Sequence, residues 1–155
     1  MDYEEIGVLS IAKIQIPSKK RISKAAFAVL ECPQEIPCDP CIKACKFGAI
    51  TKKSLIAVPE IDFDKCTGCA SCVPQCPGLA IFVINMNYSD EEALVTLPYE
   101  FELPKVGEKV DALDREGKVV GSAKIIKARL EKDKTGVISI AVKKSLGMMV
   151  RNIRR

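Results

Sequence analysis

The eight cysteines are the residues of this chain whose type and spacing can do chemistry, and they fall into two runs. The second run, Cys66 to Pro77, has the spacing C-x2-C-x2-C-x3-C-P, which places thiolates around a [4Fe–4S] cluster. The first run, Cys32 to Cys45, reads C-x5-C-x2-C-x3-C and has three extra residues between its first two cysteines. The sequence therefore predicts two iron–sulfur clusters and the single-electron chemistry that such clusters perform.

Two alternatives stay open for these cysteines. A zinc site is one, although zinc sites usually pair two C-x2-C arms across a longer gap and this chain has no histidine. The other concerns the first run, where Cys32 is displaced and Lys46 stands where the second run has Pro77. A [3Fe–4S] cluster, or a fourth ligand other than Cys32, is therefore possible there.

Other catalytic chemistry finds no support in the sequence. Without histidine, the chain cannot form a Ser–His or Cys–His nucleophile pair. No glycine-rich phosphate loop follows a predicted strand, so we expect no flavin or nicotinamide site of its own. Asp62 and Asp64 are interpreted as turn formers. We therefore expect no enzymatic activity from this chain by itself.

Composition predicts a folded protein outside the membrane. The chain has 155 residues, 48% of them hydrophobic, and no apolar stretch approaches the roughly 20 residues of a membrane span. The first residues, Met-Asp-Tyr-Glu-Glu, lack the features of a secretory signal, so the expected location is the cytoplasm. Thiols stay reduced there, which favours metal ligation over disulfide bonds.

Charge is distributed unevenly along the chain. Residues 118–155 hold eleven basic and two acidic side chains, whereas residues 1–90 hold ten of each. This basic segment is either a solvated face or a docking surface for an acidic partner. Nucleic-acid binding is the alternative function, and it is disfavoured because no aromatic residues are interleaved with the basic ones.

An internal repeat organises the cysteine region. At an offset of 31 residues the last three cysteines of the first run coincide with Cys69, Cys72 and Cys76. Each half is predicted to have a loop with two cysteines, a helical turn with the next two, and a strand. Period-two or β-branched patterns predict four strands, at residues 6–16, 25–30, 55–58 and 81–84. The polar segment 17–21 predicts a turn.

Cysteine does not recur after residue 90, where we place a domain boundary. Segments 114–117 and 132–136 predict hairpin loops, residues 137–142 predict a strand, and 122–130 could be helix or strand. The fold class is therefore predicted as α+β. Residues 1–90 form a cluster-binding domain with extra N-terminal strands, and residues 91–155 form a small, basic, β-barrel-like domain.

The segments Cys38 to Ile50 and Cys66 to Ile81 resemble the two halves of bacterial-type 2[4Fe–4S] ferredoxins, a pseudo-twofold fold. In two-cluster ferredoxins the last cysteine of each run ligates the other cluster. The resemblance therefore implies two crossed ligand sets, which are Cys32, Cys38, Cys41 and Cys76 for cluster 1, and Cys66, Cys69, Cys72 and Cys45 for cluster 2. Gly68 is expected to let the backbone pass close to its cluster.

The segment Glu31 to Cys41 further resembles the ferredoxin-type small subunits of FAD-dependent amino-acid or amine dehydrogenases of the proline and hydroxyproline type. That resemblance implies an electron-transfer subunit in a hetero-oligomer with a flavin-containing dehydrogenase. The second hypothesis is an iron–sulfur-stabilised binding or sensor protein that uses the basic segment on nucleic acid.

Overall fold

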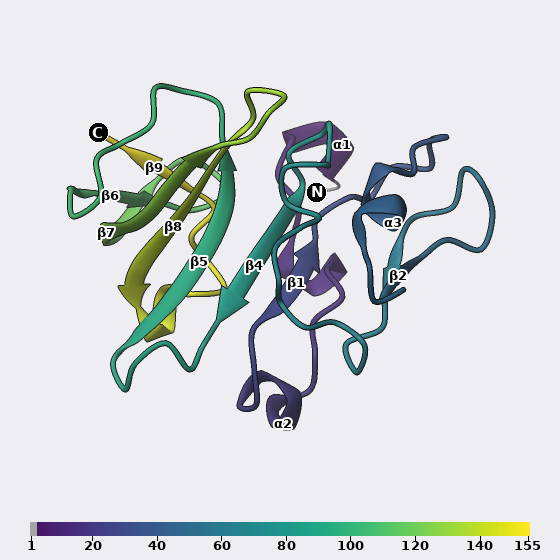
Figure 1. Ribbon diagram of the computed structural model, residues 1–155, viewed down its shortest axis with the longest axis horizontal. Helices are drawn as coiled ribbons and strands as arrows, with labels where there is room; N and C mark the ends of the chain where they lie inside the picture. Colours follow the sequence, from purple (N-terminus) through teal and green to yellow (C-terminus); the bar gives the residue numbers. More distant parts are fainter. Residues whose placement is uncertain (1–2) are drawn as a thin grey trace.

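One large antiparallel sheet and a set of cysteine-bearing loops make up the computed structural model, which describes residues 3–155 (Figure 1). The helical elements are all short: α1 (Tyr3–Ile6), η1 (Ile11–Lys13), α2 (Lys19–Ile22), α3 (Pro40–Ala44) and η2 (Lys144–Leu146). The strands are β1 (Phe27–Leu30), β2 (Ile50–Thr51), β3 (Glu60–Ile61), β4 (Ile81–Asn85), β5 (Glu92–Tyr99), β6 (Lys109–Leu113), β7 (Val119–Leu130), β8 (Gly136–Lys143) and β9 (Asn152–Arg154). The predicted mixture of helix and strand is thus confirmed, with strand dominant.

The large sheet runs without interruption from the cysteine-bearing part into the C-terminal part. Its strand order is β1-β4-β5-β8-β7-β6-β9, and the separate pair β2-β3 lies among the loops. The boundary predicted near residue 90 falls in the turn that connects β4 to β5. Both parts of the chain therefore share β4, which pairs with β1 on one side and β5 on the other.

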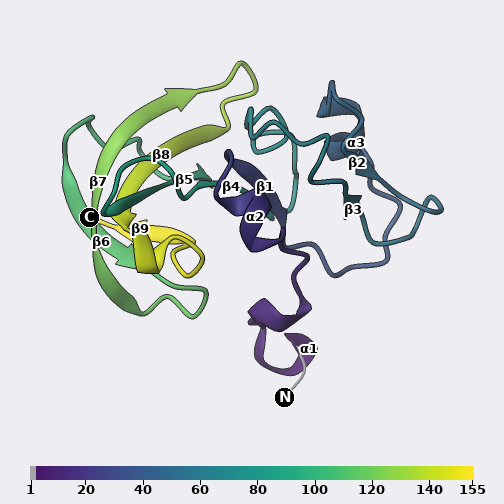
Figure 2. The same ribbon diagram turned by 90° about the horizontal axis from the view of Figure 1, so that it is seen from below.

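The predicted barrel does not close. In Figure 2 strands β5 to β9 curl strongly, but β9 pairs with β6 alone among the described strands. Closure would need a strand from the far edge to pair with the outer edge of β5. That edge already pairs with β4, so the sheet stays open and continues into the cysteine-bearing part.

Three apolar cores form on the two faces of this sheet. The largest fills the concave side of the curled strands and includes Leu97, Ile125 and Ile140. A small core holds Phe27 and Ile84 on one face of β1 and β4. The third core packs on the opposite face of the same strands. It includes Cys41 and Cys72, and Cys45, Cys66 and Cys76 pack against it, together with Ala28, Leu30, Ile50, Ile61, Val73, Ile81 and Val83. Strand alternation in β1 and β4 thus separates the cysteine core from the others.

The N-terminal strand predicted over residues 6–16 is wrong. Gly7 ends α1 with a left-handed φ of 71°, and the Ser10 hydroxyl accepts a hydrogen bond from the Ala12 amide that caps η1. Ile14 is buried, but Ile6 and Ile16 of the same alternating set are about half exposed, so the alternation does not mark one buried face. The predicted turn at 17–21 instead contains the start of α2, which Ser18 caps.

The strand predicted over 55–58 is also wrong, because these residues form an exposed loop between β2 and β3. Elsewhere the strand predictions are confirmed by β1, β4 and β8, and both hairpin loops join antiparallel strands. The ambiguous segment 122–130 belongs to strand β7. No helix within the described residues 3–155 has the length and hydropathy to cross a membrane.

Candidate iron–sulfur centres

Four cysteines from both runs line one small cavity, which we call the first site. They are Cys32, Cys38, Cys41 and Cys76. The rest of the wall is mostly apolar and includes Leu30, Ile36, Pro59, Pro77 and Ile81, with Lys52 and Gln34 as polar members. Cys41 lies in α3 and is buried. Burial raises the pKa of the Cys41 thiol, and the neighbouring Cys76 adds to that rise.

The other four cysteines line a second cavity, which we call the second site. They are Cys45, Cys66, Cys69 and Cys72. Cys45 reaches this cavity because α3 ends at Ala44 and carries the chain away from the first site. Burial raises the pKa of the Cys72 thiol to about 12, with Cys66, Cys69 and Cys45 as neighbouring charges. The two groups of four correspond to the crossed sets that the ferredoxin resemblance implies.

The donor set fits a cluster better than a single ion. Thiolates are the ligands of iron–sulfur clusters, and in both sites they surround a space. Within residues 3–155, no three cysteine, aspartate or glutamate side chains converge as a single metal ion would require. A cluster occupies space between its ligands and therefore keeps them farther apart than a single ion does. Four sulfurs around an apolar cavity fit a cluster for this reason.

Backbone amides and one hydroxyl point at the sulfurs. The Ala49 amide donates to Cys45 Sγ at 3.3 Å and the Ala80 amide donates to Cys76 Sγ at 3.4 Å. These two contacts are equivalent under the internal repeat. The Ala28 amide of β1 lies 3.4 Å from Cys66 Sγ, and the Ser71 hydroxyl lies 3.4 Å from Cys69 Sγ. Such hydrogen bonds stabilise the negative charge of a ligating thiolate.

Two cationic side chains fix the loops, and the sequence interpretation missed both. Arg21 donates to the carbonyl of Cys66 at 2.7 Å and to that of Phe63 at 2.8 Å, and also contacts the carbonyls of residues 25 and 26. Lys52 Nζ donates to the carbonyls of Ile36, Cys38 and Leu55 at 2.9 to 3.0 Å. Each site thus has one cation holding its loop. Both residues stand in polar stretches that resemble solvated turns, so no sequence signal marked them.

Gly68 is required for a reason that the sequence did not show. Its φ is +69°, and a Cβ there would lie 2.5 Å from Ala26 Cβ and 2.6 Å from the Ala26 carbonyl carbon. The close contact is therefore with the chain entering β1. Gly68 also lines the second cavity, and its predicted close approach to a cluster stays a prediction. Ala70 and Leu79 also have positive φ, and Leu79 occupies the repeat position equivalent to Gly48.

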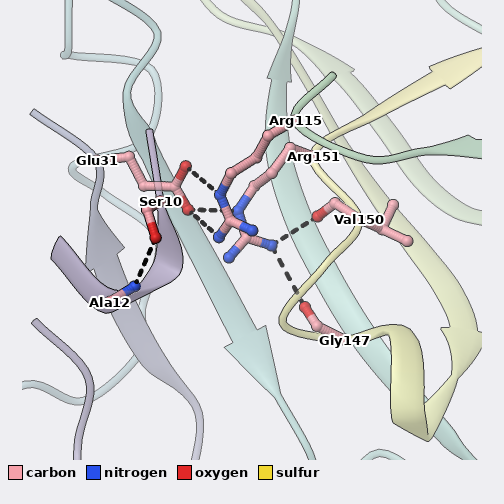
Figure 3. A network of polar contacts seen from close by, with 7 residues as sticks. All are labelled: Ser10, Ala12, Glu31, Arg115, Gly147, Val150 and Arg151. Atoms are coloured by element: carbon pink, nitrogen blue, oxygen red, sulfur yellow. Dashed lines mark hydrogen bonds and ion pairs between the residues drawn. The ribbon is translucent and has the colours of Figure 1, made fainter. Parts of the chain in front are cut away.

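A buried ion network joins the first site to the C-terminal strands. Glu31, next to Cys32, receives Arg115 Nη2 and Arg151 Nε, each at 2.6 Å from Oε1, and Arg115 Nε at 3.0 Å from Oε2 (Figure 3). All three side chains are largely buried. Arg151 also stacks over the Phe82 ring at 5.0 Å. This network locks the Cys32 segment onto the loop after β6 and the segment before β9.

The basic C-terminal segment is partly neutralised. Five of its eleven cations form ion pairs: Lys118 with Glu116, Arg129 with Glu131, Arg151 with Glu31, Arg154 with Asp111, and Arg155 with Glu108. Among residues 3–155, the remaining lysines of this segment make no ion pair. These lysines carry the positive charge of the segment that no ion pair balances.

Comparison with known proteins identifies the second run. Residues 59–82 match the family described as 4Fe-4S binding domain. This segment contains Cys66, Cys69, Cys72 and Cys76. The predicted iron–sulfur chemistry is therefore confirmed at this level, and zinc loses its support as the alternative.

Three curated relatives are similar to parts of the chain. A selenate reductase subunit of Mesobacillus selenatarsenatis is 33% identical over 112 residues, which are 70% of this chain and 37% of that protein. The pyruvate synthase subunit PorD of Methanothermobacter marburgensis is 46% identical over 46 residues, covering 30% of this chain and 51% of that protein. A subunit of the ion-translocating oxidoreductase complex of Methanosarcina acetivorans is 48% identical over 46 residues, 30% of this chain and 17% of that protein.

The chain thus spans about half or less of the length of these relatives. No solved structure matches it.

Proposed function

We propose that this chain is an electron-transfer subunit of an oxidoreductase complex and that it relays single electrons through two [4Fe–4S] clusters. The arrangement of all eight cysteines around two cavities carries the proposal. Cluster 1 would be held by Cys32, Cys38, Cys41 and Cys76, and cluster 2 by Cys45, Cys66, Cys69 and Cys72. Each cluster, when bound, supplies the exchange of one electron.

The chain itself supplies position, insulation and charge balance. Apolar residues such as Ile50, Val73 and Ile81 are almost fully buried beside the cysteines and keep water from the sulfurs. Amide donors partly balance the charge of the thiolates. Because each run contributes one cysteine to the other run's site, the two clusters would sit in one rigid unit, as in a dicluster ferredoxin.

The proposed partner is a flavin-containing dehydrogenase subunit. All three relatives are named as subunits of oxidoreductases, which supports a role inside a hetero-oligomer. A flavin takes two electrons with a hydride and passes them on singly, so it needs a one-electron carrier beside it. In this proposal the chain performs no bond-making chemistry, works in the reducing cytoplasm, and uses the lysines of the C-terminal strands for docking.

The test is anoxic isolation of the native complex followed by reduction of its flavin subunit. The proposal expects a flavoprotein in fixed ratio to this chain, and bleaching of the cluster absorbance when that flavin is reduced. Failure of the isolated holoprotein to take up electrons, together with oligonucleotide binding that weakens steeply with salt, would replace it with the nucleic-acid hypothesis.

A further inference from the structure

The two sites differ in how many hydrogen bonds reach their sulfurs. Each site has one hydrogen bond to sulfur that has an equivalent in the other half of the repeat. The Ala80 amide donates to Cys76 in the first site, and the Ala49 amide donates to Cys45 in the second. The second site has two more, from the Ala28 amide to Cys66 and from Ser71 to Cys69. Since a ligating thiolate can only accept, the Ser71 hydroxyl would be the donor to Cys69.

The first site lacks counterparts to both additional bonds. Among the described residues no hydrogen bond reaches the sulfur of Cys32 or Cys38, and Cys41 receives one only from the amide of its neighbour Ile42. Two departures from the repeat explain this. Pro40 stands at the position equivalent to Ser71 and has no hydroxyl. The three extra residues before Cys38 move Cys32 away from the position that Cys66 occupies against β1.

Solvent exposure differs in the same direction. Cys69 of the second site is exposed, whereas the first site has one buried and three half-buried cysteines. Reduction adds one negative charge to a cluster that is already anionic with its thiolates. Hydrogen bonds to sulfur and contact with water both stabilise that added charge and raise the reduction potential.

Nearby cations do not reverse this difference. Each site has one cation that contacts its loop carbonyls, Lys52 in the first and Arg21 in the second. Lys52 also lines the first cavity, but its three hydrogen bonds go to carbonyl oxygens and none goes to sulfur. Near Cys32, Arg115 and Arg151 outnumber Glu31 by one positive charge, which favours reduction of the first site. Their guanidinium groups bind the carboxylate and make no contact with sulfur, so the direct bonds at 3.4 Å dominate.

We infer that the second site holds the more easily reduced cluster and that Ser71 is one of the residues that set the difference. This inference rests on the proposed function, because it requires a cluster in each site. Electrons entering at the first site would then run downhill to the second site, and they would leave near the exposed Cys69. Ser71 acts through the sulfur of Cys69 and is a positioning residue.

Redox titration of the anoxic holoprotein, followed by electron paramagnetic resonance, tests the inference. The wild-type protein should show two midpoints, and Ser71→Ala should lower the more positive one and leave the other in place. Ser71→Thr keeps the hydroxyl and should restore the wild-type value. Pro40→Ser should raise the more negative midpoint. Ser54→Ala is the matched control, because among the described residues its hydroxyl makes no hydrogen bond to a sulfur, and it should change neither midpoint.

The inference is overturned if Ser71→Ala lowers the more negative midpoint, or if it moves neither midpoint. A single shared midpoint in the wild-type protein also overturns it. These outcomes leave the proposed function intact, because both clusters would still be present and reducible. Holoprotein with one cluster or none would contradict the proposed function itself.

Discussion

Replacing Gly68 with alanine should dismantle the second site. The substitution destabilises the fold in two ways, through its backbone conformation and through a steric clash. The left-handed backbone at φ +69° costs an alanine about 1–2 kcal/mol. The new Cβ would also lie within 2.7 Å of the Cβ, carbonyl carbon and carbonyl oxygen of Ala26, and overpacking of this kind adds about 1–3 kcal/mol.

Ala26 cannot move aside without affecting the site. Its carbonyl accepts a hydrogen bond from Arg21 at 3.0 Å, and the Ala28 amide two residues later donates to Cys66 Sγ. Relief of the clash would therefore displace the donors around the second site. Together the two costs are a large part of the roughly 5–15 kcal/mol that stabilises a typical domain.

Gly117 provides the matched control. Its φ is +76°, and a Cβ there would meet nothing within 4 Å, so Gly117→Ala has the conformational cost alone. The assay is anoxic thermal unfolding with iron and sulfide analysis of both variants. We expect Gly68→Ala to unfold at the lower temperature and to lose the iron of one cluster, while Gly117→Ala keeps both. Equal stability and full iron in the two variants would refute the reasoning.

Three further predictions concern the ligands, the ion network and the metal. Cys32→Ala should remove the iron of the first site and leave that of the second, and unchanged iron content would show that Cys32 is not a ligand. Glu31→Gln leaves two guanidinium groups buried against each other and should cost about 3–5 kcal/mol in anoxic denaturation. Arg115→Gln leaves the Glu31–Arg151 pair intact and should cost less; the reverse order would contradict the network. Iron removal should abolish hydrogen-exchange protection in residues 32–77 and preserve it in β5, β7 and β8, which have their own core. Uniform loss across the chain would contradict separate cores.

Ligand spacing and strand periodicity carried most of what could be predicted from the sequence. The chemistry of the second run could be predicted because its cysteine spacing lets one loop place several thiolates around a cluster. Strands β1, β4 and β8 are short apolar runs that contain β-branched or aromatic residues, and nearly all of their residues are buried, so the pattern predicted them. The segment 6–16 alternates apolar and polar residues as a strand can, but it forms no strand because no strand lies beside it to pair with.

The shared sheet could not be predicted, because it depends on pairing between strands far apart in the chain. Whether β5 pairs with β4 or closes a barrel is decided by tertiary packing, and the sequence pattern is the same in both cases. The same limit hid Arg21, Lys52 and the Glu31 network. Their partners are backbone carbonyls or side chains up to 120 residues away, and local pattern shows only isolated charges.

In the proposed function, two sets of four cysteines hold two clusters in one chain. Iron and acid-labile sulfide analysis of anoxically isolated protein, combined with electron paramagnetic resonance of its reduced form, tests this most directly. We expect about eight irons and about eight sulfides per chain, with signals from two interacting clusters. Zinc without sulfide, or iron for one cluster alone, would contradict it.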